Sequence, residues 1–370
     1  MYADHLLEPW IRHAVADLPG IEIFDDHTHV GTHDPSGFSA TMTELREGLA
    51  LVDGRAAVFP MAEPEGYRDA NLACAAAAAD SDGTLVSFAR ITPHEEPDKL
   101  LHEALEAGAR GVKLHLSSDE FELDDPRLEG VLAEADERRL PVLVHAGPEV
   151  AEVGDVALEV CARHPGLHLV LAHCGLTDLA WIWEDLDDTP NLYFDTSWWG
   201  ASHLMALFAL VPPGRILHGS DLPYSTPGFA TITTARCARQ AGLDDAQRRS
   251  VLGGQLARLL DGQEPLDLGP APRVEVHRPG PLLEVLYATL LCAVEPMQRG
   301  EVPGTMLSVA QHATKVPCDH PDEPVVASVA RLLELYEQHH ERLPRRNQYA
   351  PGWDLIMAAA TVARTPAAGP

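Results

Sequence analysis

Two histidines, His27 and His29, stand two residues apart in the segment FDDHTHVG at residues 24–31. Side chains at positions i and i+2 of a β-strand point to the same face, so both imidazoles can reach one metal ion. The chain has 19 histidines among 370 residues, and about one His-x-His pair is expected by chance. The pair therefore indicates a metal site only if other ligands converge on it.

Other side chains suited to metal binding or acid–base chemistry end further short apolar segments. They are Arg90, Lys113, His115, His145, His173, Asp195 and Asp221. Hydrophobic periodicity does not require these residues, and in a parallel barrel the carboxyl ends of the strands meet at one face. We expect a shell of three nitrogens and one oxygen from His27, His29, His145 and Asp221. Such a shell with an open position suits catalytic Zn²⁺ or a similar divalent ion.

The elements that must position these side chains are eight short apolar runs, rich in β-branched residues and separated by helix-like segments. The runs span residues 21–24, 56–60, 84–91, 111–116, 141–147, 167–175, 191–197 and 215–221. Strand and helix in repeated alternation indicate parallel strands with crossover helices. Eight such units predict an α/β fold of the (β/α)8 TIM barrel type. The expected helices span 41–51, 68–80, 97–108, 126–139, 154–164, 178–187, 201–210, 228–241 and 244–261.

The chain changes character near residue 262. We expect an N-terminal helical extension at 1–20, the barrel at 21–262, a linker rich in Pro and Gly at 263–280, and an all-helical C-terminal appendage at 281–370. Residues 270–370 carry 9 Lys and Arg against 11 Asp and Glu, so nearly all of the net charge of −29 lies before them. The appendage is expected to pack on the barrel or to mediate contacts in a homodimer.

Composition limits the classes of partner. With 45% hydrophobic residues the chain can bury a core, and with 56 acidic against 27 basic residues its surface repels nucleic acid and anionic membranes. The six cysteines are scattered without a Cys-x-x-Cys, the N-terminal segment lacks the apolar core of a signal peptide, and no apolar run is long enough to span a bilayer. We expect a cytoplasmic protein with a small-molecule substrate.

As an ordered set, the segments DDHTH, GVKLH, VLVHAG, LAHCG and HGSDLPY resemble the amidohydrolase superfamily. The likeness is to the amidohydrolase-related branch that includes aminocarboxymuconate semialdehyde decarboxylase, and it covers roughly residues 21–262. It implies one divalent ion, Zn²⁺ before Mn²⁺, on the four ligands named above. It also implies that His173 polarises substrate or water and that Asp221 is the base for an attacking water.

Lys113 has two interpretations. In binuclear members of the resembled superfamily, a lysine near this position is carboxylated and bridges two metal ions, and the residue that matches His173 binds the second ion. The other interpretation, which fits the mostly mononuclear branch, is a lysine that neutralises buried carboxylates or holds a substrate carboxylate. One metal ion is therefore the expectation, and a second ion with carboxylated Lys113 is the alternative.

Further residues are candidates for substrate contacts. They are Arg90, Lys113, His115, Trp198 and Trp199. The planar fork of Arg90 can grip a carboxylate or form a surface ion pair. The two tryptophans can wall a pocket for a flat substrate or pack beneath a lid. Asp26 is expected to accept a hydrogen bond from a ligating histidine.

Three functions are consistent with these residues. The first is a metal-dependent hydrolase of a small ester, lactone or amide, in which metal-activated water attacks a polarised carbonyl. The second is a non-oxidative, metal-dependent decarboxylase of a small carboxylated substrate, since both reactions use one metal shell. The third is a barrel that binds a ligand without turnover.

Overall fold

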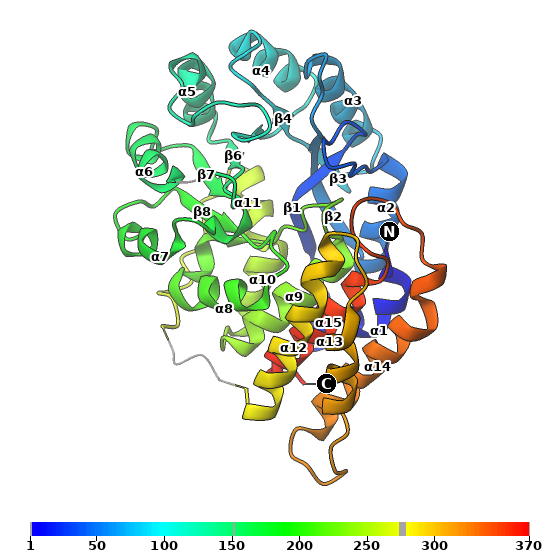
Figure 1. The fold of residues 1–370 in the computed structure, drawn as a ribbon. Coiled ribbons are helices and arrows are strands. Elements are labelled where there is room, and N and C mark those ends of the chain that lie inside the picture. The colour runs from blue at the N-terminus through cyan, green and yellow to red at the C-terminus, as the bar shows by residue number, and fades with distance from the viewer. Residues whose placement is uncertain (1, 151, 274–278, 370) are drawn as a thin grey trace.

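Parallel strands alternate with helices over the first two thirds of the chain in the computed structural model, which describes residues 2–150, 152–273 and 279–369 (Figure 1). The strands are β1 (Ile23–Val30), β2 (Gly54–Pro60), β3 (Leu85–Ser87), β4 (Ala89–Arg90), β5 (Val112–Leu114), β6 (Pro141–Val144), β7 (His168–Leu171), β8 (Leu192–Asp195) and β9 (Ile216–Leu217). Each of the eight predicted runs contains strand residues, and the run at 84–91 holds both β3 and β4. The predicted (β/α)8 arrangement is thereby confirmed.

Strand order follows chain order, in one sheet of β1 to β3 and one of β4 to β9, with parallel pairing throughout. Backbone hydrogen bonds link both pairs of sheet edges. The amide of Phe88, between β3 and β4, donates to the carbonyl of Val58 in β2 at 3.0 Å. The amide of Asp26 in β1 donates to the carbonyl of His218, directly after β9, at 2.8 Å. The second of these bonds is a contact that a closed barrel requires between its first and last strands.

The helices that follow the strands lie close to the predicted segments. They are α2 (Met42–Val52), α3 (Arg68–Ala79), α4 (Pro97–Glu106), α5 (Glu129–Arg138), α6 (Val153–Arg163), α7 (Leu179–Ile182), α8 (Ala201–Leu210), α9 (Pro227–Gln240), α10 (Asp245–Arg249) and α11 (Gln255–Leu260). Local signals set their starts. Thr41 and Glu44 form a capping box at α2, because each side chain accepts from the other's backbone amide. Across the described residues, no helix combines the length and apolar character needed to cross a membrane.

The C-terminal region is helical, as predicted, with α12 (Pro281–Gln298), α13 (Gly304–Ala313), α14 (Glu323–His339) and α15 (Trp353–Arg364). These helices pack beside α8, α9 and the N-terminal helix α1 (Asp4–Ala14), which corresponds to the predicted extension at 1–20 (Figure 1). Residues 274–278 of the predicted linker lie outside the described residues, and the domain boundaries stay a prediction.

Helix α15 joins the C-terminal region to the barrel through one continuous hydrophobic core. Its residues from Trp353 to Ala363 are all buried. The ring of Trp353 meets Tyr2 edge-on at 5.8 Å and Phe229 of α9 at 5.7 Å between ring centroids. Burying such aromatic rings is among the largest apolar contributions that single residues make. The C-terminal helices are therefore held against the barrel by its own core.

A buried carboxyl lies at this junction. Asp354 Oδ2 accepts a hydrogen bond of 2.8 Å from the backbone amide of Ala3, and Asp354 is 1% exposed. Burial raises the pKa of Asp354 from 3.8 to about 7, and the nearby carboxylate of Asp4 acts in the same direction. Between these pH values the folded protein keeps a proton that the unfolded chain has released. The contribution of Asp354 to folding stability therefore declines as pH rises from about 4 to about 7.

We expect the substitution Asp354→Asn to remove this decline, because the amide cannot ionise and its oxygen can still accept from Ala3. The variant should gain on the order of 1–2 kcal/mol in unfolding free energy relative to wild type between about pH 5.5 and about pH 8. Urea unfolding of both proteins at the two pH values measures this change. An equal difference between variant and wild type at both pH values would contradict the prediction.

Candidate functional site

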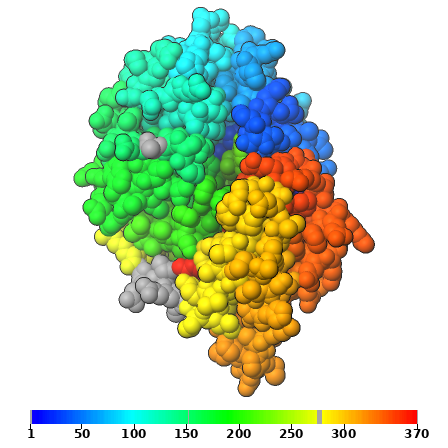
Figure 2. Space-filling model, in the orientation of Figure 1, coloured from blue at the N-terminus to red at the C-terminus, as the bar shows by residue number. Residues whose placement is uncertain are grey.

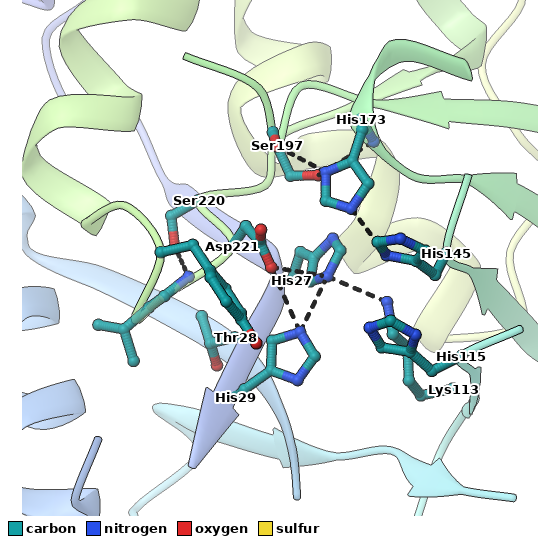
Figure 3. Close-up of polar contacts among 12 residues, drawn as sticks. His27, Thr28, His29, Lys113, His115, His145, His173, Ser197, Ser220 and Asp221 are labelled. Atoms are coloured by element: carbon teal, nitrogen blue, oxygen red, sulfur yellow. Dashed lines mark hydrogen bonds and ion pairs between the residues drawn. The ribbon is translucent and has the colours of Figure 1, made fainter. Parts of the chain in front are cut away.

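Three side chains meet at one point at the carboxyl ends of β1 and β9 (Figure 3). His27 Nε2 lies 3.2 Å from His29 Nε2 and 3.2 Å from Asp221 Oδ1, and His29 Nε2 lies 3.3 Å from the same oxygen. The structure thus places three of the four predicted ligands where one small cation can contact all three atoms. We call His27, His29 and Asp221 the histidine–aspartate cluster.

The turn after β9 brings Asp221 to β1. The amide of Asp221 donates to the carbonyl of His27 at 2.8 Å, and the backbone of Asp221 is left-handed, with φ of 58°. A Cβ at Gly219 would lie 2.6 Å from Asp26 Oδ1 and 3.0 Å from the Cβ of His27. Only glycine permits this close approach of the turn to β1. The segment HGSD is therefore shaped by contact with the first strand.

The protonation state of the two histidines suits a metal ion. His27 Nδ1 lies 2.8 Å from Asp195 Oδ2, so Nδ1 carries the proton and Nε2 presents its lone pair. Burial lowers the pKa of His27 and of His29 well below the usual histidine value, which keeps both rings neutral. Two imidazole nitrogens and one carboxylate oxygen are a donor set that Zn²⁺ and related ions prefer. The residues present therefore fit the metal that the sequence predicts.

Asp195, at the end of β8, is a supporting carboxylate that the sequence placed at a strand end without assigning it a role. Its Oδ1 accepts from the amide of His173 at 2.8 Å and from Ser197 Oγ at 2.6 Å, while Oδ2 holds His27. The expectation that Asp26 accepts from a ligating histidine is wrong. Among the residues that the structure describes, neither carboxylate oxygen of Asp26 has a hydrogen-bond partner. The only sequence signal for Asp195 was its place at a strand end.

His145 and His173 form a second pair beside the cluster (Figure 3). His145 Nδ1 lies 3.0 Å from His173 Nε2, and His145 Nε2 lies 2.6 Å from Glu149 Oε1. His145 thus faces His173 in this structure, and its role as the fourth ligand stays a prediction. His115 stacks on His145 with 4.0 Å between ring centroids.

The backbone carbonyl of Ser197 fixes the proton on His173. His173 Nδ1 lies 2.8 Å from this oxygen, which can only accept, so Nδ1 is the donor and Nε2 carries a lone pair. Burial lowers the pKa of His173 to about 3, so the ring is neutral. A neutral ring of this tautomer accepts a hydrogen bond at Nε2. In this structure His145 Nδ1 lies at that nitrogen, and the expected role of His173 in polarising substrate or water stays a prediction.

Lys113 lies beside the cluster at full burial. Its Nζ is 3.0 Å from His27 Nε2, and burial lowers the pKa of the amine to about 8. The carboxylates of Asp221 and Asp195 attract its charge and oppose this shift. Lys113 is absent from the described residues that line the adjoining cavity. The position favours a lysine that balances buried carboxylates, and the predicted substrate contact and carboxylated bridge remain untested.

A cavity of about 410 Å³ opens onto the cluster. Asp221, His145 and His173 reach its surface, and so do the four remaining substrate-contact candidates, which are Arg90, His115, Trp198 and Trp199. The two tryptophans stack with 4.6 Å between centroids, and Trp198 lies 6.0 Å from His173. Sequence reasoning missed three further aromatic side chains that line the cavity, namely Phe38, Tyr224 and Tyr349.

Arg90 is held in a buried ion pair. Its Nε and Nη2 donate to the two oxygens of Asp119 at 3.1 and 2.9 Å, and Nη2 also contacts Ser118 Oγ. The expected alternatives were a grip on a substrate carboxylate or a surface ion pair. The structure shows a paired guanidinium at 1% exposure that faces the cavity. Its charge is largely offset by Asp119, which reduces its capacity to bind a second carboxylate.

Comparisons with known proteins agree with this architecture. Residues 30–261 match a family model described as Amidohydrolase, and no curated protein sequence matches the chain. Similar solved structures include 2,6-dihydroxybenzoate decarboxylase from Rhizobium (14% identity, TM-score 0.50), which covers 65% of this chain and 98% of its own. Another is 5-carboxyvanillate decarboxylase from Sphingomonas paucimobilis (13% identity, TM-score 0.51), which covers 65% of this chain and 99% of its own. A third is 4-oxalomesaconate hydratase from Rhodopseudomonas palustris (17% identity, TM-score 0.50), which covers 65% of this chain and 95% of its own.

We expect wild-type protein purified without chelator to hold close to one divalent ion per chain. His27→Ala and His29→Ala should each lose it, because each removes a nitrogen from the cluster. Elemental analysis by mass spectrometry measures the content, and His102→Ala, at an exposed position of α4, is the matched control. A content close to two would instead support a carboxylated Lys113 as a bridge. Full metal retention in both cluster variants would contradict the assignment.

Asp195→Asn should weaken metal binding by about 10- to 100-fold, as loss of a carboxylate partner of a ligating histidine usually does. The asparagine side chain has nearly the same size as aspartate, but its NH2 group is a donor. It would face groups that now donate to the Asp195 carboxylate. Competition titration with a chromogenic chelator measures the affinity. Asp187→Asn, at an exposed site between α7 and β8, serves as the control. Equal affinity in Asp195→Asn and wild type would show that this hydrogen bond does not support the metal.

Proposed function

Because the chain belongs to the amidohydrolase family, whose members are metal-dependent enzymes, we propose that it is a decarboxylase of a small, flat, carboxylated molecule. The observation that carries the proposal is that aromatic side chains and Asp221 of the histidine–aspartate cluster line one cavity. A stacked tryptophan pair offers a broad apolar face to a ring, while the cluster offers an ion to a carboxylate. Two structures of similar fold are decarboxylases of 2,6-dihydroxybenzoate and 5-carboxyvanillate, which supports this choice.

The proposed ligands are His27, His29, His145 and Asp221, and the proposed ion is Zn²⁺, with Mn²⁺ as the second candidate. When bound there, the ion would supply Lewis acidity toward substrate oxygens. The described charged residues that line the cavity include Asp34, Glu149 and Asp221, against Arg90, which Asp119 already pairs. Negative charge around the rim disfavours a polyanionic substrate. We therefore propose a substrate with a single carboxylate and an otherwise neutral ring.

In the proposed reaction, the bond between the ring carbon and the carboxylate carbon breaks, and carbon dioxide leaves. The electron pair stays on the ring carbon, which then takes a proton from the carboxyl of Asp221. Solvent in the cavity returns a proton to Asp221. His173, whose neutral ring lines the cavity, orients a hydroxyl of the substrate. Trp198 and Trp199 hold the ring and exclude water from it.

Hydrolysis of a small ester, lactone or amide, the first hypothesis from the sequence, is the second candidate. The observation that favours it is that Asp221 and His173 both line the cavity. Asp221 can accept a proton from a water that attacks a carbonyl, and His173 can orient that water. In that reaction the proton passes to the leaving group. Both candidates thus use the same residues and differ in the bond that breaks.

The products separate the two reactions. With a panel of hydroxybenzoates and of small aryl esters, lactones and amides, we expect release of carbon dioxide and, in heavy water, deuterium at the vacated ring carbon. Incorporation of ¹⁸O from labelled water into a product carboxylate would instead indicate hydrolysis. Asp221→Asn should lower kcat by at least about 100-fold, and Asp124→Asn, at an exposed position, is the control. Metal-loaded protein that gives neither product would contradict both functions.

A further inference from the structure

The cavity contains residues from a part of the chain that lies outside the family match. Gln348 and Tyr349 line it, although the match ends at residue 261. Both residues belong to the segment between α14 and α15, which lies near α1 and α2 in the fold (Figure 1). On the molecular surface, the red-orange C-terminal segments meet the blue N-terminal ones (Figure 2). The C-terminal region thus contributes atoms to the candidate active site.

The barrel side holds this segment by polar contacts. Arg346 pairs with Glu44, the capping residue of α2. The side-chain amide of Asn347 donates to the hydroxyl of Tyr2 at 2.6 Å. Side chains next to Tyr349 therefore contact α2 and Tyr2, which lies just before α1.

The C-terminal region holds the segment from the other side. The amide of Ala350 donates to the carbonyl of Met297 in α12 at 2.7 Å, and the amide of Tyr349 donates to Asn347 Oδ1 at 2.9 Å. Contacts on both sides of Tyr349 restrict its backbone to one conformation. A side chain fixed in this way presents a defined surface to a ligand, because little conformational freedom is lost on binding.

Tyr349 is the outer member of a run of aromatic contacts that ends at the metal ligands. Its ring meets Phe38 edge-on with 4.9 Å between centroids, Phe38 lies 4.6 Å from Tyr224, and Tyr224 lies 5.9 Å from His29. We call Phe38, Tyr224 and Tyr349 the second aromatic wall. Trp198 and Trp199 lie on the His173 side of the cluster, whereas the second wall lies on the His29 side. A flat ligand that reaches the cluster has an aromatic surface on either side.

The charges near Tyr349 restrict which chemical groups the ligand can carry at the end that lies away from the metal ligands. Burial raises the pKa of the Tyr349 hydroxyl above its ordinary value, and the carboxylates of Asp221 and Asp34 act in the same direction. The phenol therefore stays neutral and can donate a hydrogen bond. The carboxylate of Asp34 disfavours a negative charge there. An uncharged oxygen, such as a ring hydroxyl or methoxy group, matches this environment.

We propose that Tyr349 is a specificity-determining residue, and that the C-terminal region supplies the part of the second aromatic wall that contacts the substrate ring away from the metal ligands. The preferred substrates carry an uncharged oxygen at that end of the ring. This proposal rests on the proposed function for the identity of the substrate, and on the contacts of Tyr349 for its position.

Two variants test the proposal with a series of benzoates that differ by one ring hydroxyl. Tyr349→Leu removes the ring and should raise KM by about 10-fold or more, with a smaller change in kcat, because uniform binding is lost. Tyr349→Phe removes only the hydroxyl and should lower the preference for the hydroxylated benzoate by about 5- to 10-fold. Metal content should equal that of wild type in both. Quenching of tryptophan fluorescence gives the dissociation constants without turnover.

Tyr336→Phe is the matched control, since it removes a hydroxyl from α14 at a residue outside the described cavity lining. It should leave KM, dissociation constants and substrate preference unchanged. Wild-type substrate preference and affinity in both Tyr349 variants would overturn the proposal, and so would equal changes in Tyr336→Phe.

A second measurement separates this proposal from the proposed function. Protein grown with 3-fluorotyrosine and loaded with Mn²⁺ reports how near each tyrosine lies to the ion, and Tyr349→Phe identifies the Tyr349 signal. We expect the signals of Tyr349 and Tyr224 to broaden more than that of Tyr336. If wild type turns over no benzoate but this pattern holds, the proposed function fails and the position of Tyr349 stands. A Tyr349 signal no broader than that of Tyr336 would overturn the proposal itself.

Discussion

The hydrogen bond between His27 Nδ1 and Asp195 Oδ2, 2.8 Å long and fully buried, is the contact on which the site depends. It selects the tautomer of His27 and so directs the Nε2 lone pair toward His29 and Asp221. Asp195 also accepts from the amide of His173, which ties the turn after β7 to the end of β8. One carboxylate therefore sets the relative positions of three strand ends. A hydrogen bond to an ionised acceptor is strengthened by such burial, and leaving it unmade would be costly.

The periodicity of the sequence was sufficient to predict the barrel and part of the histidine–aspartate cluster, and the reasons are physical. Apolar runs and amphipathic segments report on burial directly, so the alternation of strands and helices could be predicted. The i, i+2 spacing of His27 and His29 fixes their common face, and the shared carboxyl end of parallel strands brings Asp221 to them. Neither inference needed knowledge of the side-chain contacts between neighbouring strands.

The remaining features depend on contacts between residues distant in the sequence. Asp26 and Asp195 both stand among strand residues, and only the side-chain contact between β1 and β8, which are not paired strands, decides which one meets His27. The partner of Arg90 is Asp119, in a loop that the strand pattern does not describe. Phe38, Tyr224 and Tyr349 form one wall although more than 300 residues separate the first from the last. Such neighbours become visible only when the chain is folded.

The place of Tyr349 in the chain has a consequence for the order in which the molecule matures. A ribosome delivers residues from the N-terminus onward, so His27, His29 and Asp221 leave it well before Tyr349 does. All residues of the histidine–aspartate cluster and of β1 to β9 are present in a nascent chain that still lacks α15 and the segment before it. The cluster residues and the last part of the cavity lining thus emerge at different times. A chain interrupted during synthesis between these points would contain the proposed metal ligands but not the tyrosine that lines the cavity beside Phe38.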